Sequence, residues 1–152
     1  MSARRDAAAR EYERMVIVSA YLNFPGTCAE AFRFYEQVLG GQILSMQTHG
    51  ESPMRDQSPP EWHSAVIHVR MKVGNQLLMG SDAPPPYFEK PQGFAVSVSF
   101  PTVQESERVF TALAEGGRVT MPFQATFWSP GFGGVVDRFG TPWTVNTETI
   151  EL

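Results

Sequence analysis

His68 and Arg70 are the residues whose types and spacing best suit catalysis or ligand binding, because they are two positions apart in the stretch Ala65–Val73. Apolar and polar residues alternate there, as in a strand with one buried and one wet face, and both side chains fall on the wet face. Histidine titrates near neutral pH, and arginine binds a carboxylate or phosphate through paired hydrogen bonds. We expect His68 to be the candidate acid or base and Arg70 a ligand contact, if this face lines a pocket. The alternative is a His68 bonded to a neighbour and a solvated Arg70 at the sheet rim.

Other reactive side chains are less well placed in the sequence. His49 and His63 flank a proline-rich loop and are expected to be solvent-exposed, while Glu51 and Asp56 on the loop could reach in as a lid. Cys28 lies between a strand and a helix, where a lone cysteine is usually a packing residue. No pattern indicates a paired nucleophile and base.

The segment from residue 124 to 143 is the second candidate for a site. Its aromatic residues Phe127, Trp128, Phe132 and Trp143 alternate with glycines that allow close backbone approach. The residues 137–140, Asp-Arg-Phe-Gly, predict a tight turn. The segment is typical of a hairpin that carries aromatic rings to a pocket, and the alternative is that the rings are ordinary core.

Length and composition limit the class of protein. A chain of 152 residues predicts one domain, and no apolar run is long enough for a membrane span. The 12 basic residues against 16 acidic ones, without a basic cluster, argue against a nucleic-acid partner. The first fifteen residues do not have a signal-peptide pattern. A single cysteine excludes an internal disulfide and favours a reducing, cytoplasmic location.

A repeat with an offset of 76 residues organises the chain. Phe24-Pro25 recurs as Phe100-Pro101, and the double glycine at 40–41 recurs at 116–117. The first half predicts strands over 16–24, 42–48, 65–73 and 76–81, and a helix over 27–39 with Thr27 and Glu30 as a capping box. The second half predicts a matching strand and helix, then strands over 118–126, 131–137 and 141–147. The first half also carries a longer loop at 49–62.

The predicted fold class is therefore α+β, with two βαβββ modules. Neither module could bury its sheet alone, so we expect one curved mixed sheet with helices on the outer face and a cup on the inner one. Residues 1–15 are expected to form a helical extension, and 16–152 a single domain. That domain comprises a module at 16–82, a stiff proline-rich linker at 83–92 and a module at 93–147.

The duplicated βαβββ pattern resembles the vicinal-oxygen-chelate superfamily, which includes glyoxalase I, bleomycin-resistance proteins and dioxygenases. It is more similar to the PhnB-like branch, whose members are also named 3-demethylubiquinone methyltransferase-like domains. The resemblance extends over about 16–147. The motifs that carry it are Tyr21-Leu22-Asn23-Phe24, Gly26-Thr27-Cys28, Phe34-Tyr35 through Leu39-Gly40-Gly41, Leu78-Met79-Gly80-Ser81-Asp82, Thr126-Phe127-Trp128, Gly131-Phe132-Gly133, Val136-Asp137-Arg138-Phe139-Gly140 and Pro142-Trp143.

The resemblance implies where a metal would bind in relatives that use one. The corresponding positions here are Ser19 or Tyr21, Leu78, Ser97 and Thr144, none of which is a histidine or a carboxylate. We therefore expect no metal site and predict no cofactor. The glycines at 131–134 follow an aromatic strand and precede another strand, so they cannot present a helix N-terminus to a ligand, whereas a methyl donor is usually cradled by a glycine-rich turn between a strand and a helix.

These observations predict a PhnB-like small-molecule-binding protein of the glyoxalase/bleomycin-resistance superfamily. One alternative is a metal-dependent or His68-assisted enzyme, and another is a structural or regulatory module whose cavity is filled by its own aromatic residues. The resemblance further implies a homodimer, while the charge composition and the lack of a long apolar run predict neither nucleic acid nor membrane as a partner. The expected ligand pocket comprises Tyr21, Asn23, His68, Arg70, Leu78, Ser97, Gln124, Phe127, Trp128 and Thr144.

Overall fold

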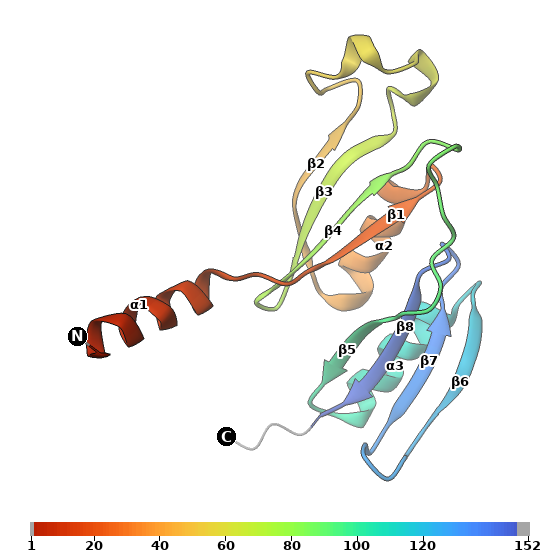
Figure 1. Cartoon of the computed structure of the whole chain (residues 1–152). Helices are drawn as coiled ribbons and strands as arrows, with labels where there is room; N and C mark the ends of the chain where they lie inside the picture. Colours follow the sequence, from red (N-terminus) through yellow and green to blue (C-terminus); the bar gives the residue numbers. More distant parts are fainter. Residues whose placement is uncertain (1, 149–152) are drawn as a thin grey trace.

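Two modules with the same order of elements follow one another along the chain, as the repeat predicts (Figure 1). The structure is a computed structural model, and it describes residues 2–148. The first module comprises β1 (Ala20–Phe24), α2 (Cys28–Leu39), β2 (Gln42–Thr48), β3 (Val66–Val73) and β4 (Gln76–Asp82). The second comprises β5 (Val96–Phe100), α3 (Val103–Ala114), β6 (Arg118–Gln124), β7 (Phe132–Val136) and β8 (Pro142–Thr147). Helix α1 (Ser2–Met15) precedes both, and the loop after β2 contains the short 3-10 helices η1 (Arg55–Gln57) and η2 (Pro60–Trp62).

The α+β class and the two βαβββ modules are confirmed. Instead of one continuous curved sheet, the strands form two four-stranded sheets, with strand orders β1-β4-β3-β2 and β5-β8-β7-β6. In each sheet the first strand pairs in parallel with the last, and the other pairs are antiparallel. Each module therefore completes its own hydrogen-bonded ladder, and one edge of β1 and of β5 has no neighbouring strand among residues 2–148.

Helix α2 ends where the sequence predicts, but it does not begin with the expected capping box. Gly40 closes it in a left-handed conformation at φ 66°, which glycine adopts without strain. The Thr27 side chain makes no capping bond. Instead, Asp82 Oδ1 at the end of β4 accepts the backbone N–H groups of Gly26 and Cys28 at 3.0 and 2.9 Å. A carboxylate fifty-four residues away from Cys28 thus supplies the cap, because the fold places the end of β4 beside the start of α2.

Strand β1 is shorter than predicted, since it begins at Ala20 and not at Val16. Ala20 pairs with Leu78, and β4 begins only two residues earlier, so no strand is available to pair with residues 16 and 17. Val16, Ile17 and Val18 are 55, 68 and 87% exposed. The expected helical extension takes the form of α1, which projects away from both modules (Figure 1).

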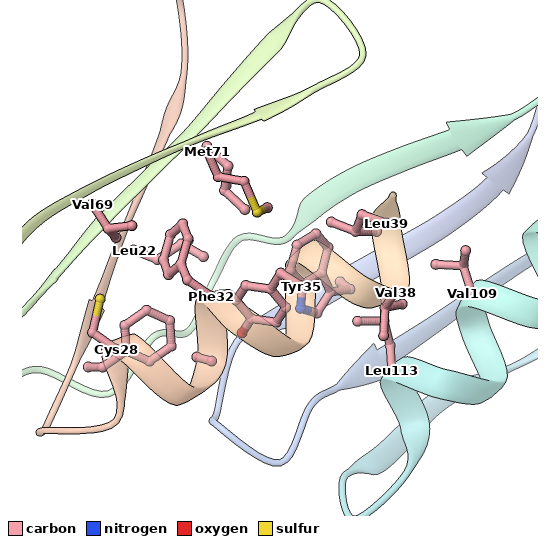
Figure 2. Close-up of a cluster of buried hydrophobic side chains, with 14 of the residues drawn as sticks. Leu22, Cys28, Phe32, Tyr35, Val38, Leu39, Val69, Met71, Val109 and Leu113 are labelled. Carbon is pink, nitrogen blue, oxygen red and sulfur yellow. The ribbon is translucent and has the colours of Figure 1, made fainter. Parts of the chain in front are cut away.

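The two modules share one core through their helices. Each helix covers one face of its own sheet, and α2 also lies against α3. Figure 2 shows Val38 of α2 beside Val109 and Leu113 of α3, and all three are buried. The guanidinium of Arg108 on α3 donates to the Val38 carbonyl at 3.1 Å. Helix packing, rather than strand pairing, therefore holds the modules together.

A buried carboxylate adds a polar connection between the modules. Asp137, in the turn after β7, accepts the Tyr35 hydroxyl of α2 at 2.5 Å and the Trp143 indole N–H at 2.8 Å. The backbone N–H groups of Phe139 and Thr141 donate to its other oxygen at 2.8 and 3.0 Å. Burial, together with the charge of Asp137, raises the pKa of Tyr35 well above its ordinary value, so Tyr35 remains a donor. The predicted turn at 137–140 is confirmed by the bond from Gly140 N–H to the Asp137 carbonyl.

Candidate functional site

The face of each sheet that is turned away from its helix is the candidate site, and we call it the open face. On the helix-facing side, Val69 and Met71 of β3 are completely buried. His68 and Arg70, their neighbours on the same strand, point the opposite way because side chains alternate along a strand. The open faces carry most of the predicted pocket residues.

The open face of the first sheet carries a stacked pair of rings. Tyr21 of β1 and His68 of β3 lie with ring centroids 5.8 Å apart and an interplanar angle of 25°. The Tyr21 hydroxyl is 3.3 Å from His68 Nδ1, so the two side chains are joined by a hydrogen bond as well as by stacking. Next to this pair, Ser81 donates to the Asn23 side chain at 3.2 Å. The predicted residues Tyr21, Asn23 and His68 therefore come together on one surface.

Arg70 lies on the same open face and is exposed to solvent. Its neighbours across the strands are Ser45 on β2 and Met79 on β4, both uncharged. Lys72, two residues further along β3, is exposed on the same side. Lys72 was not among the predicted pocket residues, although the strand alternation that selects Arg70 also selects Lys72.

The open face of the second sheet is made of hydroxyl, amide and aromatic groups. Ser97 lies opposite Thr144, and Phe132 pairs with Asn146 on one side and with Gln124 on the other. The structure thus brings the predicted residues Ser97, Gln124 and Thr144 onto one surface. The side-chain oxygen of Asn146, Oδ1, is buried there without a hydrogen-bond partner among residues 2–148.

The loop before β7 presents the predicted aromatic residues. Trp128 packs edge-on against Phe132 at 5.4 Å, and Phe127 packs against Trp128 at 4.8 Å. The buried Ser129 hydroxyl donates to the Gly131 carbonyl at 2.8 Å and fixes this loop to the start of β7. Trp128 is 53% exposed and Phe127 is 97% exposed, so these rings do not fill a cavity of the chain. The fourth aromatic of the segment, Trp143, is 1% exposed and belongs to the core.

The prediction of Leu78 as a pocket residue is wrong. Leu78 is 6% exposed and belongs to the hydrophobic core on the helix-facing side of β4. The reason is Gly80, which shares that side: a Cβ at Gly80 would lie 2.7 Å from the Phe32 ring of α2. The close approach of α2 fixes which side of β4 faces inward, and it places Met79 on the open face beside Tyr21 and Arg70.

The expected exposure of His49 and His63 is also wrong, because both are half-buried within the long loop. His49 Nδ1 lies 3.1 Å from the Ser58 hydroxyl, and His63 Nε2 lies 3.1 Å from the carbonyl oxygens of Arg55 and Ser58. These histidines hold the loop together. The sequence could not show this, because their hydrogen bonds depend on how the irregular loop folds back on itself. Cys28 is completely buried, in agreement with a packing role.

A pocket of about 490 Å³ opens beside the free edge of β1. It shares Tyr21 and Asn23 with the open face of the first sheet. Its other lining residues are Leu22, Glu89, Lys90, Pro91, Gln92, Phe94 and Thr141. Four of these, residues 89–92, belong to the linker, which therefore forms a wall of the candidate site and also connects the modules. The sequence identified the linker only as a stiff connector.

Metal-ligating side chains are scattered over the described part of the chain. Within residues 2–148, no group of three or more histidine, cysteine, aspartate or glutamate side chains is placed to hold a metal ion. Over the same residues, no helix has the length and apolar character needed to cross a bilayer.

Comparisons with known proteins identify the family and the fold of the chain. The family described as 3-demethylubiquinone-9 3-methyltransferase matches residues 17–146. Protein YjdN of Escherichia coli (strain K12) is 34% identical over 137 residues, which cover 85% of this chain and 93% of YjdN. The crystal structure of PA1353 from Pseudomonas aeruginosa is 43% identical with a TM-score of 0.81, covering 88% of this chain and 98% of that one.

Two further solved structures are similar to the chain, one a PhnB protein and the other an enzyme with the glyoxalase fold. The putative 3-demethylubiquinone-9 3-methyltransferase, PhnB protein, of Bacillus cereus is 26% identical with a TM-score of 0.74, covering 86% of this chain and 98% of its own. A glyoxalase/bleomycin resistance protein/dioxygenase family enzyme from Burkholderia phytofirmans PsJN is 14% identical with a TM-score of 0.58, covering 85% of this chain and 95% of its own, and has the same fold.

Proposed function

The chain belongs to the PhnB-like family described as 3-demethylubiquinone-9 3-methyltransferase, and we propose that it binds a small organic molecule on the open faces of its two sheets. One observation carries the proposal. Residues from strands far apart in the sequence bring hydrogen-bonding groups and aromatic rings together on the open faces, while the helices bury the opposite faces. A few oriented polar groups among aromatic side chains are the usual composition of a small-molecule site.

The glycines of the second module do not fit a methyl-donor cradle. Gly133 and Gly134 lie within β7, and the next element along the chain is the strand β8. A Cβ at Gly133 would lie 2.7 Å from the Phe110 ring, and one at Gly134 would lie 2.6 Å from the Thr120 hydroxyl. These glycines therefore make room for protein side chains on both faces of the sheet, whereas a methyl donor is usually held by a glycine-rich turn that leads into a helix.

We propose that the protein acts as a homodimer, in which a second copy encloses the open faces. The observation behind this is the exposure of large apolar side chains at the second module: Met121 and Trp128 are 41 and 53% exposed. Scattered exposed side chains are ordinary, but these two lie on β6 and the neighbouring loop together with Phe127, which is 97% exposed. Light scattering is expected to give twice the 16.9 kDa of one chain, and a value of one chain at micromolar concentration would contradict the dimer. The single, buried cysteine supports a cytoplasmic location.

The proposed function is tested by thermal unfolding in the presence of a panel of thiol conjugates, antibiotics and quinones. A ligand at about 100 times its Kd stabilises the native form by about 2.7 kcal/mol, which raises the midpoint by several degrees. Trp128→Ala is expected to abolish the shift produced by a binding compound. Tyr12→Ala removes an aromatic side chain that is 71% exposed on α1, and it is expected to leave the shift unchanged. A compound that raises the thermal midpoint of Trp128→Ala and of Arg70→Met as much as that of the wild type would bind outside the open faces, and this would contradict the proposal.

A further inference from the structure

Acidic residues are almost absent from the strands. The chain has 16 aspartates and glutamates, but the eight strands contain a single one, Asp82. Asp82 does not face the open side, because it is 6% exposed and its oxygens accept backbone N–H groups of Gly26, Cys28 and Val66. Neither open face therefore carries a strand carboxylate.

Basic residues, in contrast, remain on the open face of the first sheet. His68, Arg70 and Lys72 occupy alternate positions of β3 and point to the same side. The residues opposite Lys72 on the adjacent strands are Gln42 and Leu77, which are uncharged like the neighbours of Arg70. The two permanent cations thus lie close together on a face to which no strand contributes a carboxylate, in a chain whose formal net charge is −4.

These cations also have no ion-pair partner in the described part of the chain. Among residues 2–148 the only salt bridge joins Arg108 and Glu105 on α3. The mutual repulsion of Arg70 and Lys72 is therefore not offset by a protein carboxylate, and an anion bound between them would be favoured by both charges. Arginine offers in addition a planar pair of donors that matches the oxygens of a carboxylate, sulfonate or phosphate.

Flat groups lie beside these charges. The stacked Tyr21 and His68 rings share the open face with Arg70, and Tyr21 is 46% exposed. Tyr21 also lines the 490 Å³ pocket beside β1, together with the exposed ring of Phe94. The single acidic residue of that lining is Glu89, which belongs to the linker and not to a strand. A ring of the ligand could contact Tyr21 while its acidic group reaches Arg70.

We infer that the ligand of this site is an organic anion that carries a flat ring, with its acidic group bound by Arg70 and Lys72 and its ring against Tyr21. This inference rests on the proposed small-molecule function and names the chemical class that the site selects. It predicts discrimination between two molecules that share their rings and differ only in an acidic group.

A matched pair of fluorescent probes tests this discrimination. 8-Anilino-1-naphthalenesulfonate is an aromatic anion, and N-phenyl-1-naphthylamine has the same rings without the sulfonate. The wild-type protein is expected to bind the anion at least about tenfold more tightly than the neutral probe. Arg70→Met is expected to weaken the anion at least about tenfold and to change the neutral probe by less than about twofold. Arg70→Lys keeps the charge and is expected to lose less affinity for the anion than Arg70→Met.

The control variant is Arg33→Met, which removes the same charge from the exposed side of α2. It is expected to change neither affinity by more than about twofold. Circular dichroism and the thermal midpoint establish that each variant is folded. Equal binding of the two probes, or an anion affinity that Arg70→Met leaves unchanged, would overturn the inference, as would the binding of neither probe. The thermal-unfolding panel tests the proposed function separately. A neutral compound that stabilises the wild-type protein but not Trp128→Ala would support small-molecule binding even if the inference about an anion were wrong.

Discussion

The hydrogen bond between Tyr35 and Asp137 gives the sharpest prediction, because it joins the two modules inside the shared core. Tyr35 is completely buried on α2, and its hydroxyl donates to Asp137 Oδ2 at 2.5 Å and lies 3.0 Å from the Thr141 hydroxyl. Tyr35→Phe removes only this hydroxyl, so the ring contacts with Trp143 at 5.1 Å are kept. Asp137 Oδ2 retains the indole N–H of Trp143 but loses a donor in a buried place.

The expected loss of stability follows from this geometry. A hydrogen bond to a charged group contributes about 1.5–3 kcal/mol, and an unsatisfied buried partner adds to the cost. We expect Tyr35→Phe to lower the free energy of unfolding by about 2–3 kcal/mol. For a domain of this size the thermal midpoint should fall by about 5–10 °C.

Urea unfolding followed by tryptophan fluorescence and far-UV circular dichroism measures this change. The two signals should give one coincident transition, since the modules share a core and unfold together. Tyr12→Phe, on an exposed residue of α1, is the matched control and is expected to have no effect. A Tyr35→Phe protein within about 0.5 kcal/mol of the wild type would refute the reasoning.

Alkaline pH gives a second readout of the same residue. Because the pKa of Tyr35 is raised in the folded state, the folded protein keeps a proton that the unfolded chain releases above about pH 10. The stabilisation by Tyr35 is therefore complete below that pH and is lost above it, at about 1.4 kcal/mol per pH unit. Tyr35→Phe should show a shallower decline above about pH 10, and an unchanged slope would mean that the hydroxyl is not held in its neutral form.

Two further predictions concern Cys28 at the start of α2 and Asp82, which caps that helix from the end of β4. Burial, and to a smaller extent the nearby charge of Asp82, raises the pKa of the Cys28 thiol. A disulfide reagent at about pH 8 should therefore leave the native protein unmodified for about an hour, and it should modify one thiol per chain in guanidinium chloride. Rapid labelling of the native protein would contradict the burial of Cys28. Asp82→Ala leaves three backbone N–H groups without their acceptor and is expected to cost about 3 kcal/mol or more in urea unfolding, whereas Asp56→Ala on the exposed loop should cost less than about 0.5 kcal/mol. Equal stability of these two variants would show that Asp82 does not cap the helix.

Much of the architecture could be predicted from local pattern. The offset of 76 residues predicts two modules because recurring breaks and apolar periods specify the same elements twice. Strand alternation places Arg70 and His68 on the side of β3 away from the core, because a side-chain period of two is a property of the strand itself. The turn at 137–140 likewise depends on a few adjacent residues.

Other features depend on contacts between residues that are distant in the sequence. The strand at the start of the first module begins late because its partner β4 is too short, and Leu78 faces the core because Gly80 admits Phe32 on that side. The cap of α2 comes from Asp82, at the end of a strand formed by a later part of the chain. None of these is visible in a local window, since each is decided by which atoms the fold brings within about 3 Å.

The sequence by itself determined which residues are polar, aromatic or acidic and which of them share a face of one strand, because those properties reside in single residues and in the strand period. Only the tertiary structure decided that the modules pack helix against helix and leave two open faces, because that choice depends on the joint burial of Tyr35, Val38 and Val109 with the turn at Asp137. The contact of Tyr21 with His68, across 47 residues of sequence, depends on both the order and the register of β1, β4 and β3.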